Sequence, residues 1–365
     1  MPLPRPSGPL RIILWSTAIA AAVGAAYAQI QVLEEGGRAL APYNMARGAT
    51  VGAVIGGVLT CIEVVVLDRP LGAPLRRAPF TAHVAVKTAL YLGVILLGLK
   101  LGAALFPQPG QAGIERGDVL FSLAVTFVFV FILDLNTLLG QNVLLNFITG
   151  RYYRPRLESR VFLFLDMQGS TGLAERLGPL DFHRLLNRFV LDLTEPIVAK
   201  RGEIHRYVGD ELIATWTLKD GIASARCVEA CFGAMEGLAR RAPDYTREFG
   251  VSVAVRAGLH CGPVVAGEMG SVKKEIVFLG DTVNTAARIQ ELCRETGERV
   301  IASAELIDRL ELPPGIAKRP LGDLRLRGKG AELGLYALTK TAPGAGRARP
   351  KAARSWLRGT PAALS

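Results

Sequence analysis

Two aspartates follow short segments that have the character of β-strands. Asp166 follows the apolar run Val161–Leu165, and Asp210 lies in a Gly-Asp turn between the expected strands 203–208 and 212–217. If the first strand lies beside this hairpin, the two carboxylates converge. Such a pair could bind Mg²⁺, which takes oxygen ligands and shares them with substrate phosphates. Ordinary turn chemistry explains the Gly-Asp pair equally well, so the pair alone assigns no function.

The segment directly after Asp166 is small, flexible and placed to open a helix. It reads Met-Gln-Gly-Ser-Thr-Gly over residues 167–172. The backbone N–H groups of Gly169, Ser170 and Thr171 could wrap phosphate oxygens, as helix N-termini do. An ordinary helix N-cap is the alternative interpretation.

A polar pair marks a later segment, which we expect to form a helix from Asp281 or Thr282 to about Glu295. Asn284 and Arg288 are four residues apart and therefore share one face of that helix. A neutral amide and a fixed cation could orient a sugar and neutralise phosphoryl charge. By itself the pattern Asn-x-x-x-Arg is weak.

Taken together, these segments resemble those of the class III adenylate/guanylate (nucleotidyl) cyclase family, and in particular its membrane-anchored bacterial members. The resemblance covers about residues 157–340, roughly half of the chain, and five blocks occur in the family's order. They read Phe-Leu-Asp-Met-Gln-Gly-Ser-Thr (164–171), Tyr-Val-Gly-Asp-Glu-Leu-Ile-Ala (207–214), Gly-Leu-His-Cys-Gly-Pro-Val-Val-Ala-Gly (258–267), Gly-Asp-Thr-Val-Asn-Thr-Ala-Ala-Arg (280–288) and Leu-Arg-Gly-Lys-Gly (326–330).

The resemblance implies a ferredoxin-like α+β catalytic core with a two-metal site. In the family's pattern, Asp166, Asp210 and the backbone of Met167 would hold two Mg²⁺ (or Mn²⁺) ions per active site. Asn284 matches the residue that orients the ribose. Arg288 matches the arginine that stabilises the transition state.

The resemblance also implies how the substrate is held and how the site is assembled. Arg327 and Lys329 match basic residues near the terminal phosphates. In the family the metal pair and the Asn/Arg pair meet across the interface of a head-to-tail dimer. Since this one chain carries both sets, a homodimer would have two complete sites.

Two positions bear on the choice of nucleotide. Family members that use ATP often have Lys where this chain has Arg206, and Asp or Thr where it has Val277. Arg206 can donate to adenine N1, which is an acceptor, whereas guanine N1 carries a hydrogen and prefers an acidic partner. The side chain of Val277 cannot read the base. The sequence therefore favours ATP as substrate.

The expected function is a membrane-bound adenylate cyclase that converts ATP to 3′,5′-cyclic AMP and pyrophosphate. A guanylate cyclase is an alternative, as is a catalytically silent cyclase-like module that binds nucleotide or a partner. Loss of a metal aspartate or of Arg288 would mark the silent module, and all three are present. The Gly-Asp-Glu turn at 209–211 also occurs in diguanylate cyclases, to which the Asn284/Arg288 helix does not belong.

Four apolar stretches precede the catalytic segment, at about 12–30, 48–67, 84–106 and 119–139. Each is near the ~20 residues that a helix needs to cross a bilayer. We therefore expect a four-helix transmembrane domain at 1–140 and a connector at 141–156. The catalytic domain would span 157–340, and residues 341–365 would form a basic, disordered tail.

Arginines in the flanking segments set the expected orientation. The positive-inside rule places both termini in the cytoplasm, so the chain would be a multi-pass protein of the cell (inner) membrane with a cytoplasmic catalytic domain. The residues concerned are Arg5, Arg11, Arg69, Arg76, Arg77, Arg151, Arg154 and Arg156. Alternatively, Ala26-Tyr27-Ala28 ends a cleaved signal peptide, which would leave three spans.

The net charge of +11 does not indicate a nucleic-acid partner. Residues 1–140 carry a net +3 and residues 340–365 a net +6, which leaves +2 for the 199 residues between them. A nearly neutral central domain is a poor binder of phosphate backbones. The excess next to apolar segments indicates a lipid bilayer instead.

Overall fold

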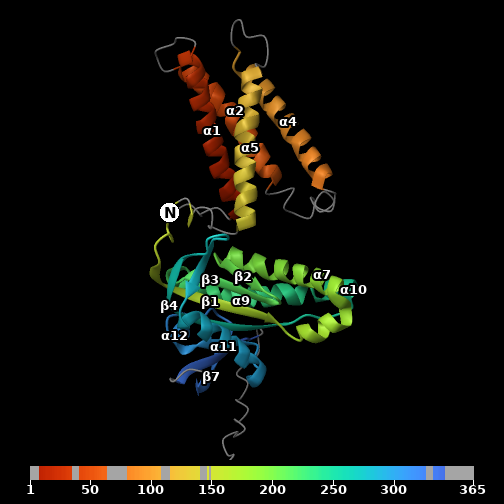
Figure 1. The fold of residues 1–365 in the computed structure, drawn as a ribbon, viewed down its shortest axis with the longest axis vertical. Coiled ribbons are helices and arrows are strands. Elements are labelled where there is room, and N and C mark those ends of the chain that lie inside the picture. The colour runs from red at the N-terminus through yellow and green to blue at the C-terminus, as the bar shows by residue number, and fades with distance from the viewer. Residues whose placement is uncertain are drawn as a thin grey trace, which may run out of the picture. The chain divides into compact units, whose positions relative to one another are not determined.

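The computed structural model divides the chain into two units, Met1–Leu144 and Leu145–Ser365, both drawn in Figure 1. The division falls within the expected connector 141–156, and the expected tail 341–365 lies almost entirely outside the described residues. The structure describes residues 8–34, 41–63, 80–107, 116–139, 146–147, 149–325 and 332–341.

Nearly all described residues of the first unit are helical. Its long helices are α1 (Gly8–Glu34), α2 (Pro42–Cys61), α4 (Phe80–Leu105) and α5 (Arg116–Leu139). They overlap the four apolar stretches of the sequence, except that residues 64–67 lie outside the described residues. Within the described residues, two segments are long and apolar enough to cross a membrane, Ile12–Glu34 and Val86–Leu105.

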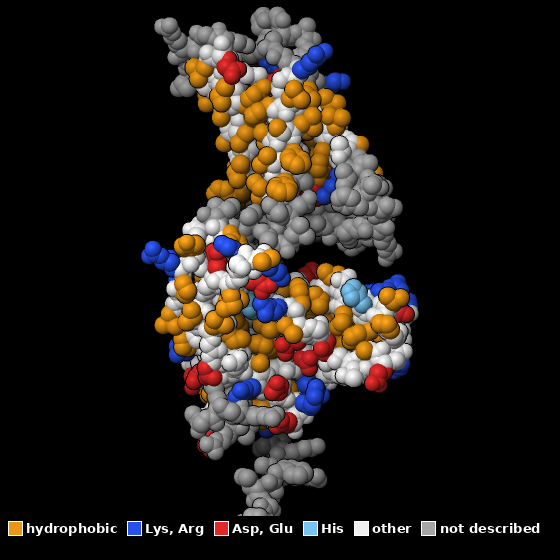
Figure 2. All heavy atoms as spheres, viewed as in Figure 1, with side chains coloured by type: hydrophobic (Ala, Val, Ile, Leu, Met, Phe, Trp, Pro, Cys, Tyr) orange, Lys and Arg blue, Asp and Glu red, His pale blue; other side chains and the backbone are white. Residues whose placement is uncertain are grey.

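The surface of this helical unit is unusually apolar. Trp15 on α1, Leu97 on α4 and Phe127 on α5 are 64%, 68% and 70% exposed. Figure 2 shows hydrophobic side chains over much of the visible surface of these helices, with charged groups gathered toward their ends. Such a surface favours contact with an apolar environment over contact with water.

Small residues allow α1 and α2 to approach each other closely. A Cβ atom added at Gly52 of α2 would lie 2.1 Å from the carbonyl oxygen of Ala20 in α1, and one added at Gly48 would lie 2.2 Å from the oxygen of Gly24. No side chain fits in these gaps. Close backbone contact of this kind is typical of helices that associate in membranes.

Replacing Gly52 by leucine is therefore expected to separate α1 from α2 and to lower the melting temperature of the detergent-solubilised chain. Overpacking of this kind costs about 1–3 kcal/mol or more. Gly93→Leu is the matched control, because a Cβ at Gly93 meets nothing within 4 Å. Equal melting temperatures for the two variants would contradict the close α1–α2 contact.

Among the described residues, the second unit forms an eight-stranded mixed sheet. Its order is β2-β3-β1-β4-β6-β8-β7, with β5 paired to one end of β4. The pair β4–β6 is parallel, and the other pairs are antiparallel. The strands are β1 (Arg156–Met167), β2 (Glu203–Val208), β3 (Glu211–Thr217), β4 (Val255–Met269), β5 (Glu275–Leu279), β6 (Val300–Ser303), β7 (Ile316–Arg325) and β8 (Glu332–Lys340).

Helices cover both faces of this sheet, and α7 and α11 lie on different sides of the strands (Figure 1). Helix α7 contains a break at Gly178, where φ is 75°, so it consists of two helical segments. The helices are α7 (Ser170–Ala199), α8 (Leu218–Ile222), α9 (Arg226–Arg240), α10 (Ala242–Phe249), α11 (Asp281–Thr296) and α12 (Ala304–Ile307).

Strand β1 separates two layers of buried side chains, because successive residues of a strand point to opposite faces. Leu165 is buried in the main core with residues of α7 and α9. Phe162 and Phe164 belong to a smaller cluster on the other face, together with Ala286 of α11. Asp166 follows Phe162 and Phe164 in this alternation and therefore lies on the α11 face of the sheet.

Candidate active site

Asp166 and Asp210 lie next to each other at one end of the β1–β3 pair. The register places Asp166 opposite Glu211, so the turn residue before Glu211 adjoins the end of β1. Burial raises the pKa of Asp166 to about 6, assisted by the charge of Asp210 and by a hydrogen bond between the two carboxyl groups. Burial and a neighbouring negative charge both disfavour an ionised carboxyl group, so this pair lacks a compensating positive charge.

Glu211 extends the acidic group, although the sequence analysis did not single it out. Burial raises the pKa of Glu211 to about 7, and the charges of Asp166, Asp210 and Glu291 raise it further. Its position directly after Asp210 was visible in the sequence. Its proximity to Asp166 depends on the β1–β3 register, which the sequence does not give.

The acidic group has the chemistry of a site for a hard divalent cation. A bound cation would favour the charged carboxylates and lower their raised pKa values. The side chain of Met167 is buried in the main core, which leaves its backbone carbonyl as a ligand. In the described part of the chain, no three His, Cys, Asp or Glu side chains surround one metal position. Substrate phosphates and water would complete the shell, as is usual for Mg²⁺.

The segment Gly169–Thr171 forms the start of α7, three residues beyond Asp166. Gly169 takes the N-cap position with φ 71°, and its helix has no side-chain cap. This left-handed backbone conformation favours glycine. The first-turn N–H groups, those of Ser170 and Thr171 included, have no partner within the helix. They can therefore donate to an anion held beside the carboxylate pair.

Asn284 and Arg288 lie on the outer face of the first half of α11. Asn284 is exposed and Arg288 is half-buried. Neither forms a hydrogen bond or an ion pair with the residues that the structure describes. The inner face of α11 is buried against the sheet and includes Ala286, Ile289 and Gln290. Both polar side chains are thus available to a ligand outside the chain's own core.

The carboxylate pair lies on the other side of the same helix. Gln290 is buried and lies beside Asp166, where its side chain lowers the pKa of that carboxyl group and partly offsets the effect of burial. At about 100° per residue, the side chain of Gln290 is turned about 120° from Asn284 and about 160° from Arg288. Since Asp166 faces the inner side of α11, one chain does not bring its own Asn/Arg pair and carboxylate pair together.

The two positions predicted to read the base lie on β2 and β5, which do not pair with each other in the sheet. The Nη2 atom of Arg206 in β2 donates to Oε2 of Glu275 in β5 at 2.6 Å. Val277 lies two residues further along β5, opposite Gly267 of β4, and is half-buried. The sequence analysis missed Glu275, because its contact with Arg206 spans 69 residues.

Arg327 and Lys329, expected near the terminal phosphates, lie outside the described residues.

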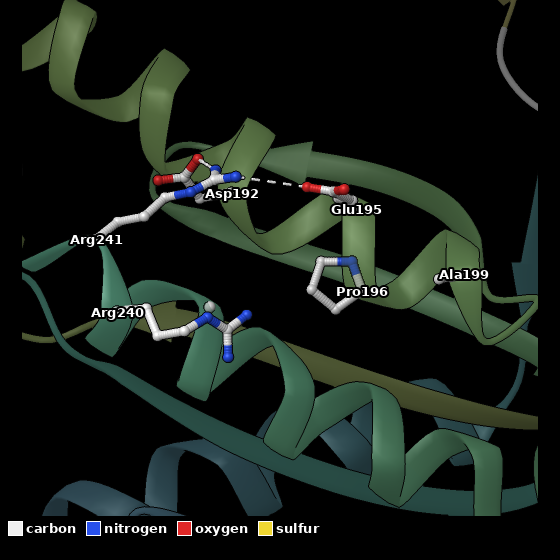
Figure 3. Close-up of a pocket in the computed structure, with 7 residues that line it drawn as sticks. Asp192, Glu195, Pro196, Ala199, Arg240 and Arg241 are labelled. Atoms are coloured by element: carbon white, nitrogen blue, oxygen red, sulfur yellow. Dashed lines mark hydrogen bonds and ion pairs between the residues drawn. The ribbon is translucent and has the colours of Figure 1, made fainter.

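A separate hollow lies between α7 and α9, on the opposite side of the sheet from Asp166. Arg241 lies between two carboxylates there and pairs with Asp192 and, at 3.5 Å, with Glu195 (Figure 3). The lining residues are Asp192, Glu195, Pro196, Ala199, Gly237, Arg240 and Arg241. No site residue predicted from the sequence lines this hollow.

The chain is similar in sequence to known proteins. Residues 153–340 match the family described as "Adenylate and Guanylate cyclase catalytic domain". The protein "Adenylate cyclase 2" of Rhizobium meliloti is 33% identical over 300 residues, which cover 80% of this chain and 83% of that protein. An adenylate cyclase of Anabaena cylindrica is 25% identical over 180 residues, which cover 48% of this chain and 35% of that longer protein.

The fold has counterparts among solved structures. A bacterial light-regulated adenylyl cyclase matches with a TM-score of 0.52 and 19% identity, over 63% of this chain and 66% of that chain. At this identity the likeness concerns the fold alone. It confirms the predicted class, an α-helical region followed by an α+β domain with the ferredoxin-like class III arrangement.

Proposed function

Because the chain belongs to the family of adenylate and guanylate cyclase catalytic domains, we propose that it converts ATP to 3′,5′-cyclic AMP and pyrophosphate. One observation carries the proposal. The neighbouring carboxylates of Asp166 and Asp210 lie on the sheet side of α11, and Asn284 and Arg288 lie unpaired on its outer side among the described residues. The family relation gives these four residues complementary tasks.

The reaction is an internal transfer of the α-phosphorus. The ribose 3′-oxygen forms a bond to the α-phosphorus and loses its proton to water, while the bond between that phosphorus and the pyrophosphate oxygen breaks. Asn284 would orient the ribose so that the 3′-oxygen lies in line with the leaving group. Arg288 would donate to the α-phosphate oxygens, where negative charge develops.

Asp166, Asp210 and the backbone carbonyl of Met167 would hold two Mg²⁺ or Mn²⁺ ions. When bound, such ions activate the attacking hydroxyl and neutralise the leaving pyrophosphate. The raised pKa values of Asp166 and Glu211, about 6 and about 7, support this task, because they mark carboxyl groups that lack a compensating cation. The N–H groups at Ser170 and Thr171 would hold phosphate oxygens next to the ions.

We propose that two copies of the chain form each active site in a head-to-tail homodimer. Asn284 and Arg288 face outward from α11, while Asp166 lies beneath its inner face. Each carboxylate pair would therefore meet the Asn/Arg pair of the other copy. A two-fold dimer of this kind has two equivalent sites.

ATP is the proposed substrate because Arg206 presents a donor that suits adenine N1 and opposes guanine N1–H. The R. meliloti relative is also named as an adenylate cyclase. We further propose that the helical unit spans the cell membrane with the catalytic domain in the cytoplasm. The exposed apolar side chains of α1, α4 and α5 and the two segments long enough to cross a bilayer support this location.

The proposed function is tested with the purified full chain in lipid nanodiscs. We expect 3′,5′-cyclic AMP and pyrophosphate in equal amounts from ATP, in the presence of Mg²⁺ or Mn²⁺, and no product after chelation of the metal. GTP should be converted more slowly at equal concentration. Faster conversion of GTP would make the chain a guanylate cyclase, and no cyclic product from either nucleotide would contradict the proposal.

A further inference from the structure

We propose that Glu275 is a specificity-determining residue, whose carboxylate accepts a hydrogen bond from the 6-amino group of adenine while Arg206 donates to N1. The inference rests on the proposed function and deepens it, because it supplies the acceptor that Val277 lacks. It is drawn from the contact between β2 and β5.

The strand geometry places Glu275 on the same side of β5 as Val277. Side chains two residues apart on a strand share a face, so Glu275 can reach the space for which Val277 has no polar atom. Phe278, which follows Val277, lies on the opposite face of β5 and is held there by two contacts. Its ring contacts the Arg160 guanidinium at 4.4 Å and the His205 ring at 4.9 Å. This anchoring fixes β5 and hence the position of Glu275.

A β-bulge in β2 directs Arg206 toward Glu275. The register of β2 against β3 shifts between Ile204 and Arg206, so His205 is the extra residue. Bulges of this kind re-aim a side chain beside an active site. Burial, with the charges of Arg206 and Arg160, lowers the pKa of His205 to about 4. At neutral pH His205 is therefore an uncharged support against Phe278 and adds no charge to the pair.

The Arg206–Glu275 pair remains accessible to a ligand. The two side chains are 47% and 38% exposed, and their Nη2–Oε2 distance is 2.6 Å. The other carboxylate oxygen of Glu275 lies 2.6 Å from Nζ of Lys273, which holds the carboxylate in place. Exposed ion pairs contribute little to stability, so either group can rotate toward a base at small cost.

The order of donor and acceptor matches adenine. The adenine edge presents an acceptor at N1 and a donor at its 6-amino group, and guanine presents a donor at N1 and an acceptor at O6. With the Arg206 donor at N1 and the Glu275 acceptor at the 6-position, both contacts are made by adenine. Both are reversed for guanine, where donor would face donor and acceptor would face acceptor.

The experiment removes the two partners of the proposed hydrogen bond one at a time. The full chain in nanodiscs, with Mg²⁺, is titrated calorimetrically with 3′-deoxy-ATP and with the 3′-deoxy triphosphate of purine riboside, which lacks the 6-amino group. Neither nucleotide has the attacking hydroxyl, so binding is measured without turnover. We expect the first to bind at least about tenfold more tightly, as is typical of a hydrogen bond to a charged group.

In Glu275→Ala the ratio of the dissociation constants of the two nucleotides should fall to near one. In Glu275→Gln, whose amide oxygen still accepts a hydrogen bond, this ratio should be intermediate. Glu268→Ala is the matched control, because Glu268 lies on β4 opposite Ile276 of β5 and pairs with Lys274 at 3.5 Å. It should keep the wild-type ratio.

Two binding results would overturn the inference. A Glu275→Ala chain that weakens both nucleotides equally would show that Glu275 only supports Arg206, and a wild-type chain that does not discriminate would exclude the contact. Failure of the proposed function and failure of this inference give different results. A chain that discriminates through Glu275 but forms no cyclic AMP keeps this inference and loses the function. A chain that forms cyclic AMP while Glu275→Ala keeps its ratio loses only this inference.

Discussion

Replacing Asp210 by alanine is expected to lower the rate of cyclic AMP formation at least about 10³-fold, because the variant loses one of the two carboxylates that would hold the divalent cations. The expected loss is in turnover and not in folding. Asp210 is half-buried in the turn between β2 and β3, and among the described residues no hydrogen bond or ion pair to a buried side chain other than the neighbouring carboxyl depends on it. The measurement is the initial rate of cyclic AMP formation with saturating ATP and Mn²⁺.

Two further measurements distinguish a loss of catalysis in Asp210→Ala from a loss of folding. Removing the Asp210 charge relieves repulsion on Asp166, whose pKa it helps to raise, so the melting temperature of Asp210→Ala should not fall. Asp181→Ala is the matched control, since Asp181 pairs with Arg184 on the surface of α7. It should retain wild-type turnover. Activity in Asp210→Ala close to that of the control would show that the carboxylate pair is not the metal site.

Replacing Arg288 by alanine is expected to lower kcat by about 10²–10³-fold while KM for ATP changes little. The reason is that its guanidinium would contact charge that develops on the α-phosphate only in the transition state. Arg288 has no partner among the described residues, so its removal breaks no contact that the structure records. The measurement is a full rate profile against ATP concentration for wild type and variant.

Arg288→Lys restores the charge but not the planar fork of donors, so it should recover part of kcat. Arg247→Ala removes a surface arginine of α10 that pairs with Asp244 and serves as control. A variant in which KM rises and kcat stays constant would mean that Arg288 binds ATP in the ground state and does not act on the transition state.

Local patterns were sufficient to predict the elements that carry the four central residues. The apolar run 161–165 predicted the strand that ends at Asp166, and the structure has β1 there. The four-residue spacing of Asn284 and Arg288 predicted a shared helix face, and both lie on the outer side of α11. These inferences work because alternation and helical periodicity depend only on neighbours in the sequence.

The residues that sequence analysis missed depend on contacts between distant segments. Glu211 becomes part of the acidic group only through the β1–β3 register. Gln290 reaches Asp166 because α11 packs across the sheet. Glu275 meets Arg206 because a bulge in β2 redirects that side chain. A register, a packing angle and a bulge are tertiary features, so no local pattern records them.

The most direct test of a site shared between two chains is complementation. Asp210→Ala and Arg288→Ala are co-expressed with different affinity tags, and the mixed dimers are assayed for cyclic AMP. Each variant alone should be nearly inactive. In a mixed dimer, one site carries both substitutions and the other carries neither, so the purified mixed dimers should show about half of the wild-type rate. Recovery near that level is the predicted result, and a mixture as inactive as the separate variants would contradict the proposed arrangement.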